Sequence, residues 1–205
     1  MAVGPTYWAG FEHPGNIMLA DTLTGGGLNH TVLHELAHQW AGDKVTLASE
    51  RDFVWKEAMA EYLSMVYEDM HDSEVAAGTV ARWKTLAKDS LVYPVPDESR
   101  SLLEYYGSAY GPGPMILFRQ LEGWFGREAV LTALRELLDG GPKAISLDDV
   151  RAALESATGV DLEDYFAGWL HGAGEPAWPR ATVVVTDVER GRRSPYGAAA
   201  TMRIR

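Results

Sequence analysis

Apolar residues recur every three or four positions along most of this chain, which is the spacing of helices that bury one face. A first helix is predicted over about 29–42, ending at a turn near Gly42. Four of its apolar residues have core-facing spacing: Leu33, Leu36, Ala37 and Trp40. His34 and His38 then lie on the neighbouring face, so the pattern predicts an apolar and a polar stripe side by side.

A second helix is predicted over about 53–70. Ala58, Tyr62 and Val66 recur on its apolar side. Its polar stripe consists of Glu57, Glu61, Ser64 and Glu68. Turns rich in Pro and Gly separate further predicted helices near 73–90, 112–124, 127–139, 147–157 and 162–171.

Extended structure is expected mainly near the two ends. A short stretch near 8–12 is predicted to be extended, and strand-like segments at 181–188 and 198–205 form either a hairpin or the opening of a further β-domain. The predicted fold class is therefore mainly α with small β parts (α+β). It comprises one domain over 1–178 and a β tail over 179–205.

Composition narrows the range of partners. The 205 residues carry a formal net charge of −11, which argues against nucleic acid or an anionic membrane surface as a partner. The charge suits a substrate with a positive amine, or serves solubility alone. The absence of cysteine excludes disulfides and thiolate metal sites, and no apolar run approaches the ~18 residues of a membrane span. The first residues lack the features of a secretion signal, so we expect a cytoplasmic protein.

The pentapeptide His34-Glu35-Leu36-Ala37-His38 carries the most informative chemistry. Residues four apart lie on one helix face, so both imidazoles can bind the same ion. Glu57 follows His38 after eighteen intervening residues and supplies a third ligand. Together they predict a site for one Zn²⁺ per chain, with one position open for water. Glu35 cannot easily reach the ion as well, and it is placed to act as general base.

Several segments together resemble the aminopeptidase N family of gluzincin metallopeptidases, whose zinc glutamate has the same eighteen-residue spacing. The segments that carry the resemblance are 34–40, 42–46, 55–62, 9–15, 110–117 and 162–170. The resemblance covers the family's catalytic domain and implies a gluzincin, thermolysin-like fold. The family's large N-terminal β-domain and its C-terminal helical domain are missing from this sequence, so we expect it to be the catalytic domain alone, either as a fragment or as a minimal natural form.

The resemblance also implies roles for residues outside the zinc motif. Glu12 is expected to bind the free α-amine of a substrate. The backbone of Ala9 and Gly10 is expected to pair with the substrate as an added strand. Tyr110 is the expected hydrogen-bond donor to the oxyanion, with two other tyrosines nearby as rivals. The segment departs from the family's Gly-x-Met-Glu-Asn pattern, most notably at His13, which bears on the geometry of the amine pocket.

The sequence thus predicts a zinc aminopeptidase that acts on peptides with a free N-terminus. Two other functions stay open: hydrolysis of another bond, such as an epoxide, and a binding or scaffold module that keeps the fold without the activity. Glu61, one turn after Glu57, either orients a zinc histidine or is a solvated charge on the polar stripe. The sequence gives no signal for oligomeric state or for a preferred N-terminal residue.

Overall fold

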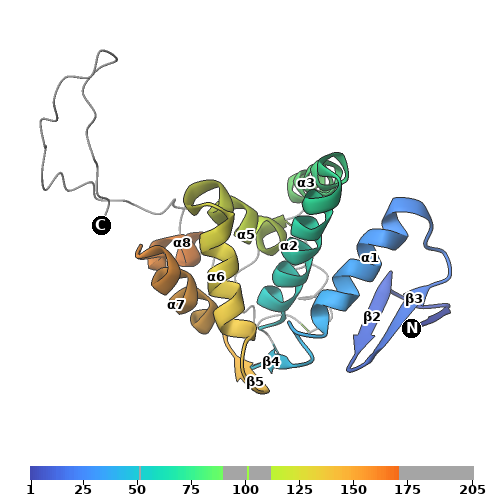
Figure 1. Ribbon diagram of the computed structural model, residues 1–205, viewed down its shortest axis with the longest axis horizontal. Helices are drawn as coiled ribbons and strands as arrows, with labels where there is room; N and C mark the ends of the chain where they lie inside the picture. The colour runs from blue at the N-terminus through green and yellow to red at the C-terminus, as the bar shows by residue number, and fades with distance from the viewer. Residues whose placement is uncertain (51, 90–100, 102–111, 171–205) are drawn as a thin grey trace, which may run out of the picture.

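The computed structural model describes residues 1–50, 52–89, 101 and 112–170 (Figure 1). Its elements, in chain order, are β1 (Ala2–Gly4), β2 (Gly10–His13), β3 (Asn16–Ala20), α1 (Gly25–His38), β4 (Val45–Leu47), α2 (Phe53–His71), α3 (Ser73–Asp89), α5 (Pro112–Phe125), α6 (Arg127–Leu138), β5 (Lys143–Ile145), α7 (Leu147–Thr158) and α8 (Glu163–Trp169). Helices dominate and the strands are short, so the predicted α+β class is confirmed. The predicted β tail lies outside the described residues, and its boundary stays a prediction.

The helices occupy layers on one side of a small sheet. Figure 1 shows β2 and β3 beside α1, α1 beside α2, and the pair α6 and α7 on the far side of the molecule. The long helix α2 is central, since it packs against α1, α3, α5 and α7. In the three-stranded sheet, β3 lies in the middle, parallel to β1 and antiparallel to β2.

The hydrophobic core lies between α2 and the later helices. Its largest fully buried members include Trp55 and Tyr62 of α2, Phe118 of α5, and Tyr165 of α8. Each side chain of this size contributes on the order of 1.5–3 kcal/mol by leaving water. Among the described residues, none from α1 belongs to this core cluster.

The predicted apolar stripe of α1 is therefore wrong. Leu36 and Trp40 are 46% and 49% exposed. The residues that α1 buries are instead His30, Thr31, His34, Glu35 and His38. The reason is tertiary: the inner face of α1 meets the polar stripe of α2, so polar groups on both helices satisfy one another at a buried interface.

Helix α1 begins and ends about four residues earlier than the sequence pattern indicated. The helix runs over Gly25–His38 rather than 29–42. At Gly42, φ is +142°, in a region that side chains disfavour, and its N–H donates to the Val45 carbonyl at 2.8 Å. This turn leads the chain into β4, which pairs in parallel with β5, nearly a hundred residues later.

The sequence pattern did not predict the β4–β5 pair, because each strand has only three residues. Val45 and Ile145 are buried at this pairing, which connects the loop after α1 to the start of α7. None of the described helices is long and apolar enough to cross a membrane.

Candidate metal centre

Three potential ligand atoms converge between α1 and α2. His34 Nε2 lies 2.9 Å from His38 Nε2 and 3.2 Å from Glu57 Oε2. His38 Nε2 lies 3.5 Å from the same carboxylate oxygen. The two histidines are one helical turn apart on α1, Glu57 faces them from α2, and all three side chains are buried.

These residues fit a tetrahedral metal ion. Bonds of about 2.0–2.2 Å in tetrahedral geometry keep ligand atoms about 3.3–3.6 Å apart. The separations of 3.2 and 3.5 Å from Glu57 Oε2 are close to this range, and the 2.9 Å between the two histidine nitrogens is somewhat shorter. His38 Nδ1 donates a hydrogen bond to the Ala41 carbonyl at 2.9 Å, which leaves the lone pair on Nε2. The donor set of two imidazoles and a carboxylate is one that zinc prefers.

Glu61 holds the outer side of the His34 ring. Its Oε1 lies 3.2 Å from His34 Nδ1, which directs the opposite ring nitrogen towards Glu57. Its Oε2 accepts a hydrogen bond from the Trp83 indole N–H at 2.7 Å. Of the two readings that the sequence left open, the structure therefore favours the positioning role, because Glu61 is buried and paired rather than solvated.

A second layer of polar groups lies behind Glu61. The His30 ring lies between two carboxylates, with Nε2 3.1 Å from Glu61 Oε2 and Nδ1 2.7 Å from Glu68 Oε1. The Thr79 hydroxyl of α3 donates to Glu68 Oε2 at 2.7 Å. The sequence pattern assigned no function to His30 or Glu68, although His30 lies one helical turn before His34 and Glu68 lies two turns after Glu61.

Glu35 lies beside the convergent ligand atoms and against the backbone of β2. A Cβ atom on Gly10 would lie only 2.7 Å from Glu35 Cγ and would overlap its carboxylate oxygen. Only glycine allows this close approach of strand and helix. Ligand atoms of Glu12, Glu35 and His38 lie within 4.8 Å of one another, so the two carboxylates lie together beside the candidate metal ligands.

Lys56 joins Glu12 to the metal-ligand group. Its Nζ lies 2.6 Å from Glu12 Oε1 and 2.9 Å from Glu57 Oε1, and its side chain is only 15% exposed. The second oxygen of Glu57 is the one that faces the two histidines. No local pattern predicts this contact, because Glu12 and Lys56 lie on elements far apart in the chain.

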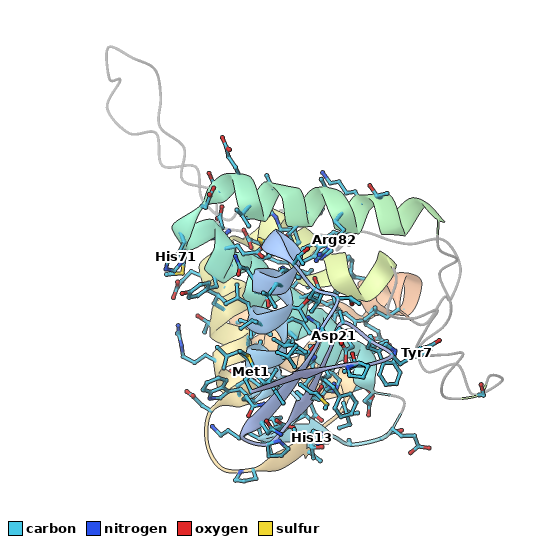
Figure 2. All side chains as sticks on the ribbon, turned by 90° about the vertical axis from the view of Figure 1, so that its right-hand side faces the viewer. Met1, Tyr7, His13, Asp21, His71 and Arg82 are labelled. Atoms are coloured by element: carbon cyan, nitrogen blue, oxygen red, sulfur yellow. The ribbon has the colours of Figure 1, made fainter. Side chains whose placement is uncertain are left out.

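The turn between β2 and β3 fixes Glu12 relative to α1. The side-chain amide of Gln39, just after α1, donates through Nε2 to the His13 carbonyl at 3.1 Å and accepts through Oε1 from Gly15 N–H at 2.7 Å. Figure 2 shows the sheet in front of α1, with His13 at the lower end. The His13 side chain itself is exposed and packs on the Phe11 ring.

The two predicted backbone partners of the substrate differ in the structure. The Ala9 carbonyl already accepts a hydrogen bond from Ala20 N–H at 2.9 Å within the sheet. Because backbone groups of an antiparallel strand alternate in direction, those of Gly10 and Glu12 point to the other edge of β2. Gly10 therefore suits the predicted pairing, whereas Ala9 does not.

In the protein without a bound metal ion, neighbouring charges and burial set the protonation of these groups. Burial lowers the pKa of His34, but hydrogen bonds to Glu57 and Glu61 outweigh it and raise this pKa to about 10. Burial raises the pKa of Glu35 above its usual value, which suits a general base. For Glu12 burial acts in the same direction, yet the Lys56 ammonium outweighs it and holds the pKa low.

The structure thus brings together six of the eight residues assigned from the sequence: Glu12, Gly10, His34, Glu35, His38 and Glu57. Ala9 is adjacent but paired within the sheet. Tyr110 lies outside the described residues, as do the rival tyrosines, so its role stays a prediction.

A buried group of two histidines and a glutamate, with a further carboxylate beside it, defines a candidate metallohydrolase site. Residues 20–169 match the peptidase family M1 domain. The chain belongs to this family. The predicted resemblance to the aminopeptidase N family and the metallopeptidase class are confirmed.

The relatives span bacteria, archaea and animals. The chain is 27% identical to aminopeptidase N of Streptomyces lividans over 160 residues, 70% of this chain and 18% of that protein. It is 29% identical to glutamyl aminopeptidase of Bos taurus over 161 residues, 71% of this chain and 16% of that protein. It is also 28% identical to the tricorn protease-interacting factor F2 of Thermoplasma volcanium over 169 residues, 71% of this chain and 20% of that protein. The chain thus spans about a fifth of the length of these relatives.

Solved structures support the fold. An M1 zinc metallopeptidase from Deinococcus radiodurans, in a mutant form bound to a Tyr-Ser-Ala substrate, superposes with a TM-score of 0.68. The match has 21% sequence identity and covers 87% of this chain and 40% of that one. At this identity the likeness establishes the fold alone.

Proposed function

We propose that this domain is a zinc-dependent aminopeptidase that hydrolyses the N-terminal bond of peptides. The observation that carries the proposal is the convergence of His34 Nε2, His38 Nε2 and Glu57 Oε2, with Glu35 beside them. Bound there, one zinc ion supplies a water of lowered pKa and polarises the scissile carbonyl.

Glu35 handles protons in this proposal. Its carboxylate takes a proton from the attacking water and delivers it to the leaving amine, which requires a pKa closer to neutrality than that of a free glutamate. The raised pKa of Glu35 supports this role. The Gly10 backbone holds the side chain in place by packing directly against it.

Glu12 selects the substrate in this proposal. An α-ammonium group can pair with its carboxylate only when the first residue of a peptide lies at the site, so the enzyme acts on free N-termini. The short separation of Glu12 from Glu35 and His38 supports this assignment. Tyr110 is the proposed hydrogen-bond donor to the developing oxyanion.

The names of the relatives agree with this activity. Two of the three relatives described above are named aminopeptidases. Because the chain covers only about a fifth of each, the activity and the substrates of the whole protein are part of the proposal.

The test combines metal analysis with turnover by the 205-residue chain. We expect about one zinc per chain and release of a chromophore from unblocked amino-acid anilides but not from their N-acetylated forms. Glu35→Gln should keep the metal and reduce kcat by at least about a hundredfold. Zinc binding without turnover of any substrate would contradict the proposal and favour a binding module. Equal turnover of both substrates would refute the role of Glu12.

A further inference from the structure

Lys56 places a second ammonium group where the substrate's amine is expected. Its Nζ lies 2.6 Å from Glu12 Oε1, a separation shorter than most ion pairs. The contact is shielded, because the side chains of Lys56 and Glu12 are only 15% and 16% exposed. A shielded pair of this kind is worth more than one at the surface.

The aliphatic part of the Lys56 side chain is held in place as well as its ammonium group. A Cβ atom on Gly42 would lie 2.8 Å from Lys56 Cε, so the lysine methylenes pack on the glycine of the turn that follows α1. At the other end, Nζ also contacts Glu57 Oε1 at 2.9 Å. Lys56 is thus a built part of the site, fixed by the turn after α1, by α2 and by β2 together.

An incoming α-ammonium and Lys56 carry the same charge and require the same carboxylate. We propose that Lys56 is a specificity-determining residue that competes with the substrate's α-ammonium for Glu12 and so weakens selection for unblocked N-termini. This inference rests on the proposed function, since it takes Glu12 as the amine-binding group.

The charges of the site support a competitive role. Glu12 is the carboxylate proposed to bind the substrate's ammonium, and Lys56 Nζ already contacts it before any substrate arrives. Binding a second ammonium must therefore displace Lys56 from Glu12 or place two like charges on one carboxylate. Either event costs about as much free energy as one charge-assisted hydrogen bond contributes. The affinity for the substrate's ammonium is therefore lowered about tenfold.

Binding of small amides tests the inference without turnover. Leucinamide and N-acetyl-leucinamide are titrated calorimetrically into the zinc-loaded Glu35→Gln chain, with and without Lys56→Met. We expect Lys56→Met to bind leucinamide about tenfold more tightly, with no change for the acetylated amide. Unchanged leucinamide affinity, or an equal gain for both amides, would overturn the inference.

A matched control and a second variant separate other effects. Lys44→Met removes another lysine, whose Nζ donates to the Leu138 carbonyl at 3.0 Å, and should leave both affinities unchanged. If Lys56→Met loses zinc or does not fold, Lys56→Arg decides. The arginine guanidinium pairs more strongly with Glu12, so leucinamide should bind more weakly to Lys56→Arg than to the chain that keeps Lys56. Equal affinity for the two chains would overturn the inference. If the Lys56 form and every variant bind both amides equally, Glu12 does not read the amine, and the proposed function fails instead.

Discussion

At the scale of single residues, the site depends on partners that make buried charge tolerable. His34, Glu57 and Glu61 are each less than a tenth exposed, and every one contacts an oppositely charged or hydrogen-bonding group. Removing one partner from such a group costs more than a surface pair would, because the other partner stays buried. Even a conservative substitution of one of these residues should therefore measurably weaken metal binding.

Replacing Glu61 by glutamine should weaken zinc binding while leaving the fold intact. The carboxylate beside His34 Nδ1 is lost, and with it the group that orients this imidazole and increases its basicity. Loss of such an outer partner typically costs 10–100-fold in metal affinity. Competition with a chromophoric chelator measures this, and Ser64→Ala, on the same buried face of α2, serves as the control. Equal zinc affinity in Glu61→Gln would rule out a positioning role.

Replacing Gly10 by alanine should impair catalysis without loss of metal. The added methyl group would overlap the Glu35 carboxylate and displace it, while His34 and His38 stay in place. We expect kcat to fall by at least about tenfold, since a misplaced base transfers protons poorly. Gly4→Ala is the matched control, because a Cβ there meets no atom within 4 Å. A variant with normal kcat would show that Glu35 is not held by this contact.

At the scale of elements, α1 and α2 pack through polar groups, whereas α6 and α7 pack through apolar ones. Leu134 and Leu137 of α6 and Val150 and Leu154 of α7 are buried in the main core. The apolar pair gains stability from burial, while the polar pair depends on hydrogen bonds and ion pairs between buried groups. The C-terminal helices therefore support the site from behind without contributing a ligand among the described residues.

The start of α7 allows a test of this supporting layer. Ser146 and Asp149 form a capping box, in which each side chain satisfies the other residue's backbone N–H. Hydrogen bonds from Ser146 hold the pKa of Asp149 below its usual value. A lowered carboxylate pKa contributes stability above the unfolded pKa, and this contribution is lost as pH falls through the folded pKa.

Asp149→Asn should therefore reduce the free energy of unfolding by about 1 kcal/mol at pH 7, in the range of other cap losses. The deficit should shrink as the pH falls through the folded pKa of Asp149, which lies below the ordinary aspartate value. Urea unfolding at pH 7 and at acid pH measures this. Asp148→Asn, at an exposed position outside the box, should change little. A deficit independent of pH would show that the charge of Asp149 is not the cause.

At the scale of the whole molecule, the candidate metal centre joins two parts of the fold. The sheet and α1 form one part, which contributes nothing to the main core cluster among the described residues. The other part is the helical body organised around α2. Ligands from both α1 and α2 mean that a bound ion cross-links the two parts, so metal binding should stabilise the whole domain.

Zinc should raise the midpoint of thermal unfolding, and a chelator should lower it again. At a free zinc concentration a hundred times the Kd, the gain in stability is about 2.7 kcal/mol. Calorimetry of the metal-free and zinc-loaded chain measures it. Glu57→Ala removes one of the three proposed ligands and should abolish most of this gain. If Glu57→Ala shows the same gain as the native chain, the three-ligand assignment is wrong.

The sequence by itself determined the helices and the metal-ligand spacing, because both depend on local geometry. Residues four apart meet on any helix, so His34 and His38 could be assigned before the fold was known. The eighteen-residue interval to Glu57 completed the group. The family resemblance identified Glu12, which periodicity alone would have left as an ordinary loop carboxylate.

Only the tertiary structure decided which face of α1 is buried. It also decided that the sheet brings Glu12 to Lys56, and that His30 lies between Glu61 and Glu68. These contacts join residues more than thirty positions apart, and their energies come from burial and charge that no local pattern records. The sequence determined which groups could bind a metal, and the fold decided which neighbours hold them in place.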